Sequence, residues 1–176
     1  AQSVFRGFAL NDIYIFIKSF PDDDPSVRKG RVLSHVLIVE KNGLNEINDL
    51  EELYSYFLAE PDKDPELSCI VIDSENSGSN KTVNLMSREA AAINGILDHS
   101  SYNNTLIWVG EDGYLSFASQ LWSQLEGSLR AKLNLGVGFN PQKLNTQNHN
   151  ILYVLEVYES KWKSGGFFVV GKEDLG

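Results

Sequence analysis

Four side chains near residue 30 offer the clearest binding chemistry in the sequence. Three cations precede an apolar run, and a histidine lies inside that run: Arg28, Lys29, Arg31 and His35. Guanidinium groups match the paired oxygens of phosphates and carboxylates, so the cations could bind such a group on a ligand or partner. The histidine could contact the same group, or it could lie in the core with its ring nitrogens hydrogen-bonded to the backbone. The cations could equally pair with the acidic run before them: Asp22, Asp23 and Asp24.

Side chains of catalytic type are present, but two of them are neighbours in one predicted strand, which argues against an enzyme. Ser34, His35 and Asp73 supply the group types of a hydrolytic set, and Asp73 ends an apolar run before a polar loop. However, Ser34 and His35 are neighbours in a predicted strand, so their side chains point to opposite faces. A direct nucleophile–base pair is disfavoured in that geometry. We therefore expect no enzyme, and a hydrolase using Asp73 and His35 is kept as an alternative.

The sequence offers little to hold a metal or a nucleotide cofactor. It has three histidines and one cysteine, whereas structural zinc sites need about four nitrogen or sulfur ligands. The acidic run at 22–24 lacks the spacing of a calcium loop. There is no Gly-Lys-Ser/Thr loop, and Gly136-x-Gly138 follows a predicted helix instead of opening one. We expect no cofactor and no metal, and we do not expect the chain to be a P-loop GTPase.

Charge and hydropathy narrow the class of partner. The 176 residues carry a net charge of −9, which disfavours nonspecific binding to nucleic acid or anionic membranes, because both need a cationic face. No apolar stretch approaches the roughly 18 residues that span a bilayer, and no signal peptide is visible. We expect a cytoplasmic protein with no nucleic acid or membrane partner, and the oligomeric state is left open.

The surrounding pattern predicts alternating strands and helices. Strands are expected at 12–20, 31–41, 67–73, 105–109, 135–139, 151–158 and 167–170, and helices at 49–58, 88–98 and 115–131. The apolar run after Arg31 indicates a buried strand, and Cys69 is expected to be a small core residue. Asn48 or Asp49 can cap the first helix, and Trp122 lies on the apolar stripe of the last helix. The pattern predicts a single layered α/β domain over residues 1–176, with a mixed sheet of about seven strands and about three helices.

Three segments together resemble the N-terminal domain of GTPase-associated protein 1, a bacterial family. The first is the aromatic strand at 14–22 with its proline turn. The second is 28–38, similar to the family pattern Arg-x-Gly-x-Val-x-x-His-x-Leu, on which these residues fall: Arg28, Gly30, Val32, His35 and Leu37. The third is 121–130, which resembles the family's Trp-Ser-x-x-x-x-x-Leu-Arg helix, followed by the strand at 135–139. The family's usual opening, a Gly-Tyr-rich turn that ends in Gly-His, is reduced here to Phe5-Arg6-Gly7-Phe8.

The resemblance implies an adaptor or sensor module, here as the N-terminal part of a larger protein, in a bacterial GTPase-centred conflict (defence) system. It makes a GTPase the candidate protein partner, but it does not imply that this domain binds GTP. The expected function is therefore a non-catalytic adaptor or regulatory module that acts by protein–protein interaction. The candidate surfaces are the polar loop at 74–81 and the four residues of the basic cluster: Arg28, Lys29, Arg31 and His35. A small-ligand or nucleotide sensor, with a pocket near His35 and Arg31, is the second hypothesis.

Overall fold

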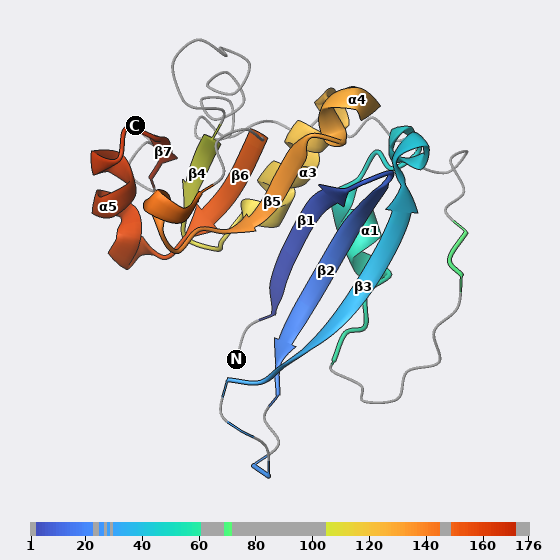
Figure 1. Ribbon diagram of the computed structural model, residues 1–176, viewed down its shortest axis with the longest axis horizontal. Helices are drawn as coiled ribbons and strands as arrows, with labels where there is room; N and C mark the ends of the chain where they lie inside the picture. Colours follow the sequence, from blue (N-terminus) through green and yellow to red (C-terminus); the bar gives the residue numbers. More distant parts are fainter. Residues whose placement is uncertain are drawn as a thin grey trace.

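The computed structural model describes residues 3–22, 25–26, 28, 30–60, 69–71, 105–144 and 149–171. In this part of the chain a seven-stranded sheet has the order β3-β2-β1-β5-β6-β4-β7 (Figure 1). One half of the sheet is antiparallel and the other half is parallel. The predicted α/β fold with a mixed sheet is therefore confirmed.

The antiparallel half is a meander of β1 (Val4–Leu10), β2 (Ile13–Pro21) and β3 (Val32–Glu40). The strands predicted at 12–20 and 31–41 are confirmed as β2 and β3. β1 was not predicted, because Arg6 and Gly7 interrupt its apolar pattern. The structure explains the glycine: a Cβ at position 7 would lie 3.0 Å from the ring of Tyr14.

The parallel half contains β5 (Leu133–Val137), β6 (His149–Val154), β4 (Thr105–Val109) and β7 (Phe168–Val170). Every residue of β4 is buried, as expected for a strand in the middle of a sheet with both faces covered. β1 and β5 meet in antiparallel orientation through one residue pair, Gly7 and Leu135. This junction is where the sheet changes from antiparallel to parallel.

The helices lie on both sides of the sheet. α1 (Leu50–Ser55) follows Asp49, one of the two predicted caps, whose side chain accepts hydrogen bonds from the N–H groups of Glu51 and Glu52. The helix predicted at 115–131 divides into α3 (Tyr114–Gln124) and α4 (Gly127–Arg130), because Leu125 is extended. α5 (Glu159–Ser164) was not predicted, and neither were the three short 3-10 segments: η1 (Lys41–Asn45), η2 (Pro141–Lys143) and η3 (Glu156–Tyr158). The helix predicted at 88–98 lies outside the described residues.

Two hydrophobic cores lie on opposite faces of the sheet. The larger one lies on what we call the inner face, where α1 and α3 pack against both halves. The smaller one lies on the opposite, outer face and surrounds Trp162 of α5, with side chains from β4 and β6. No described helix packs on the outer face of β1–β3 (Figure 1). Among the described helices, α5 therefore covers the outer face of the parallel half, and the outer face of β1–β3 has no helix on it.

Two predictions about buried strands were wrong. β3 is the edge strand and has one covered face, so its outward side chains Val32, Val36 and Ile38 are 56%, 41% and 65% exposed. An unbroken apolar run cannot distinguish a strand buried on both faces from an edge strand with an exposed apolar face. Cys69 is exposed, and residues 69–71 form no strand. The remainder of the strand predicted at 67–73 lies outside the described residues.

Candidate functional site

The cations of the basic cluster lie in the turn before β3. Arg28 is exposed, and Lys29 lies outside the described residues. The Arg31 Nε atom is 3.1 Å from an Asp22 carboxylate oxygen, in an ion pair whose arginine side chain remains 49% exposed. The main chain closes the turn, since the Asp22 N–H donates to the Arg31 carbonyl at 2.9 Å. One cation thus pairs with the acidic run and still presents part of its surface to solvent.

His35 lies on the inner face of β3, where its ring holds a main-chain group. Its Nδ1 atom accepts a hydrogen bond from the Leu58 N–H at 3.1 Å, and the Lys18 ammonium donates to the Leu58 carbonyl at 2.9 Å. Burial, and then the charge of Lys18, lower the pKa of His35 below its ordinary value. Ser34 points to the other face and bonds to Ser19 at 2.9 Å. Ser34 and His35 therefore form no nucleophile–base pair, and Asp73 lies outside the described residues.

The outer face of the meander carries an apolar surface. Pair partners in the register place these side chains on it: Phe8, Leu10, Ile13, Ile15, Ile17, Val32, Val36 and Ile38. Leu10 is 50% exposed, and the outward residues of β3 are similarly open. A polar strip crosses one end, where Arg6 Nη2 donates to Ser19 Oγ at 3.3 Å. A contiguous exposed apolar surface of this kind is typical of an interaction site.

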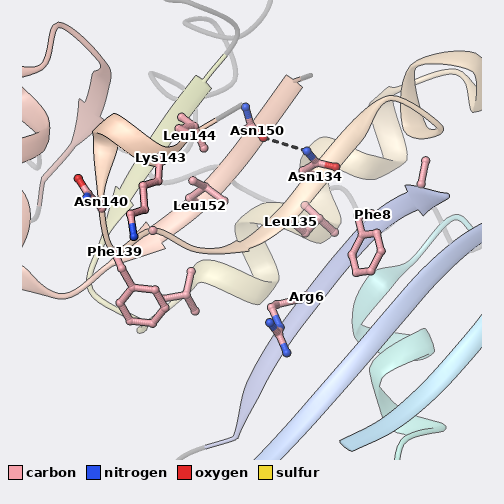
Figure 2. A pocket seen from close by; sticks show the side chains of 14 residues that line it. Arg6, Phe8, Asn134, Leu135, Phe139, Asn140, Lys143, Leu144, Asn150 and Leu152 are labelled. Atoms are coloured by element: carbon pink, nitrogen blue, oxygen red, sulfur yellow. Dashed lines mark hydrogen bonds between the residues drawn. The ribbon is translucent and has the colours of Figure 1, made fainter. Parts of the chain in front are cut away.

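A hollow of about 580 Å³ lies beside this surface, between β1 and the loop after β5 (Figure 2). We call it the hollow, and fourteen residues line it: Arg6, Gly7, Phe8, Ala9, Asn134, Leu135, Val137, Gly138, Phe139, Asn140, Lys143, Leu144, Asn150 and Leu152. Arg6 and Phe8 belong both to the hollow and to the outer face of the meander. The two surfaces are therefore continuous.

Two glycines on β5 and just after it pack closely against neighbouring side chains beside the hollow. A Cβ at Gly136 would lie 3.2 Å from Arg6 Cγ, and a Cβ at Gly138 would lie 2.7 Å from Trp162 Cζ2. The amide side chains on the floor are ordered, since Asn134 Nδ2 donates to Asn150 Oδ1 at 3.0 Å. The floor of the hollow is therefore held in part by a side-chain hydrogen bond.

The lining of the hollow is locally cationic. Among its described residues, Arg6 and Lys143 are charged and no carboxylate is present, although the whole chain carries a net charge of −9. The described residues also contain no cluster of three His, Cys, Asp or Glu side chains that could hold a metal ion. No helix in the described ranges is long and apolar enough to cross a membrane.

Comparison with known proteins matches one family to the N-terminal third of the chain. Residues 1–57 match GTPase-associated protein 1, N-terminal domain type 1. The resemblance predicted from the sequence is confirmed over these residues, which contain β1, β2, β3 and α1. No curated protein and no solved structure matches the chain. The outer face of the meander and the basic cluster lie in the part that matches GTPase-associated protein 1, whereas the far wall of the hollow lies outside it.

Trp122 and Arg130 connect the rest of the chain to the matched segment. Trp122 is fully buried, as predicted, and its Nε1 donates to the Ile47 carbonyl at 2.6 Å. Arg130 is also buried; its Nη1 donates to the Leu44 and Ile47 carbonyls, both at 2.8 Å, and its Nε donates to the Trp122 carbonyl at 3.0 Å. Sequence reasoning assigned these residues to a helix motif but missed this role. Their acceptors are main-chain oxygens, which have no sequence signature.

Proposed function

We propose that the chain is a non-catalytic interaction module of a GTPase-associated system, and that it binds a protein partner through the outer face of the meander. The observation that carries the proposal is the exposed apolar surface of β1–β3, which lies in the segment that matches the family. The family name supports a GTPase as the partner. We further propose that the system is a bacterial conflict (defence) system and that the module acts in the cytoplasm.

The shape and composition of this face favour a protein over a small ligand. Small molecules bind in concave sites, whereas the cross-strand rows here form a sheet surface of large apolar side chains, such as Phe8, Ile15 and Ile38. Removing apolar surface from water is a dominant favourable term in most protein–protein association. Arg28 and Arg31 lie at one end of the face, where they would form the polar rim that interfaces commonly have.

The predicted binding residues contribute unequally to this proposal. Lys29 is assigned to the same rim as its two arginine neighbours by its position in the sequence. His35 faces the inner side of β3, so in this proposal it positions Leu58 and does not touch the partner. The proposed interface therefore extends from the basic cluster across the outward residues of the meander.

The test looks for a GTPase gene beside the gene for this chain, co-expresses each GTPase found there with the chain, and purifies the pair through a tag on the GTPase. If no GTPase gene lies there, the proposed partner is wrong. Ile38→Glu should reduce binding at least tenfold. Ile38 is 65% exposed, so covering its exposed part contributes about 1–2 kcal/mol of the about 1.5–3 kcal/mol for full burial, and the glutamate adds the cost of burying a charge. Val157→Glu is the matched control, because Val157 is 78% exposed in η3, at the other end of the sheet. Thermal melts of both variants verify folding. If Ile38→Glu binds the GTPase as well as Val157→Glu does, the face is not the interface.

A further inference from the structure

We infer that the hollow between β1 and the loop after β5 is the binding site for a carboxylate-rich, partly apolar segment of the protein partner, held between Arg6 and Lys143. This inference rests on the proposed function, because it names the chemistry of one segment of the same partner. The hollow opens onto the outer face of the meander through Arg6 and Phe8. A partner that covers that face can therefore extend a segment into the hollow.

The charge of the hollow determines the charge of the segment. An acidic chain in general repels other acidic chains. A carboxylate-rich segment can therefore bind this chain only where the local surface is positively charged. The hollow is such a positively charged surface, because Arg6 and Lys143 are the charged residues of its described lining. Both side chains are exposed, and Figure 2 shows Arg6 on β1 and Lys143 on the opposite wall. A segment lying between them can place carboxylates against each wall.

The donor capacity of Arg6 fits this segment. A guanidinium has five N–H donors, and within the described residues the Arg6 side chain makes one hydrogen bond, to Ser19 Oγ at 3.3 Å. Gly136 allows the Arg6 stem to lie on β5, because the position has no side chain. The head group is thereby held at the wall, where it can bind a carboxylate in two-point geometry.

The aromatic and aliphatic lining explains why the segment should also carry apolar side chains. Phe139 is 65% exposed at the rim, and Phe8, Leu144 and Leu152 also contribute to the lining. A free carboxylate or phosphate would leave these groups in water. An extended segment alternates its side chains between two sides, so it can place acidic and apolar residues on the two kinds of wall.

Fluorescence anisotropy with a labelled eight-residue peptide of alternating glutamate and leucine tests the inference. The wild-type chain should bind this peptide, and a lysine–leucine peptide of the same length should not bind. Arg6→Glu and Lys143→Glu should each weaken binding at least tenfold. Lys161→Glu changes the net charge by the same amount from an exposed position on α5, and it should change binding less than twofold.

Three results would overturn the inference. The first is no binding of the acidic peptide at low salt. The second is an equal loss in Lys161→Glu, which would assign the effect to net charge. The third is displacement of the peptide by inorganic phosphate or ATP at a concentration as low as that of unlabelled peptide, which would make the hollow a small-anion site. Lys143 is exposed on a 3-10 segment, so its variant remains informative if Arg6→Glu fails to fold.

The same variants separate this inference from the proposed function when the GTPase itself is the probe. If Ile38→Glu abolishes GTPase binding while Lys143→Glu binds as the wild type does, the hollow is wrong and the interface stands. If Lys143→Glu weakens GTPase binding while Ile38→Glu does not, the hollow stands and the outer face of the meander is wrong.

Discussion

Replacing Arg130 by methionine should destabilise the fold by about 3–4 kcal/mol. The buried guanidinium makes its three shortest hydrogen bonds, at 2.8–3.0 Å, to the carbonyls of Leu44, Ile47 and Trp122, and longer ones to the Asn45 carbonyl and the Asn48 side chain. Hydrogen bonds from charged donors contribute about 1.5–3 kcal/mol each. Three independent bonds of this kind would therefore contribute more than the loss of about 3–4 kcal/mol that we expect. Two effects reduce it: the Ile47 and Trp122 carbonyls keep other donors, and burial disfavours the arginine charge, whose pKa is lowered for that reason.

Urea and thermal unfolding measure this loss. For a chain of this size, 1 kcal/mol corresponds to about 2–4 °C in Tm, so the midpoint should fall by about 6–16 °C. Lys132→Met removes the same charge from an exposed position two residues away, and its stability should stay within about 0.5 kcal/mol of the wild type. An Arg130→Met variant within 1 kcal/mol of wild type would refute the idea that this arginine holds the segment before α1.

Two further changes test other parts of the structure. Because the pKa of His35 is lowered in the folded state by burial and by Lys18, stability should fall as the pH drops below about 6.5, the unfolded value. Melts from pH 8 to pH 5 should show a smaller decrease in His35→Gln, and identical slopes would contradict this linkage. Gly138→Ala should cost about 1–3 kcal/mol in urea unfolding by overpacking against Trp162, since its Cβ would lie 2.7 Å from that ring. Gly43→Ala, with its nearest contact at 3.4 Å, is the control, and an equal loss there would exclude the steric explanation.

Much of the fold could be predicted because its signals are local. Clusters of β-branched and aromatic residues located β2 and β4 within one or two residues, and the helix cap was narrowed to Asn48 or Asp49, of which Asp49 is the cap. β1 was missed because Arg6 and Gly7 are typical of a turn, whereas here the arginine faces outward and the glycine accommodates a ring from the neighbouring strand. Its detection depends on a pairing that the local sequence does not show.

The candidate surfaces were less predictable for the same reason. The basic cluster is contiguous in the chain, and its ion pair with Asp22 joins residues close in sequence. By contrast, His35 bonds to Leu58, and the hollow brings Arg6 to the same surface as Lys143. These pairs come together only when β1 lies beside β5 and the helix after β3 folds back. Neither event leaves a periodic or compositional signal in the sequence.

Isoleucine methyl NMR of the chain, titrated with the GTPase that co-purifies with it, observes the proposed interface itself. Binding through the outer face of the meander predicts shifts or broadening at Ile15 and Ile38, with little change at the core residues Ile107 and Ile151. If the GTPase binds while Ile15 and Ile38 stay unchanged, the partner occupies another surface and the proposed interface is wrong.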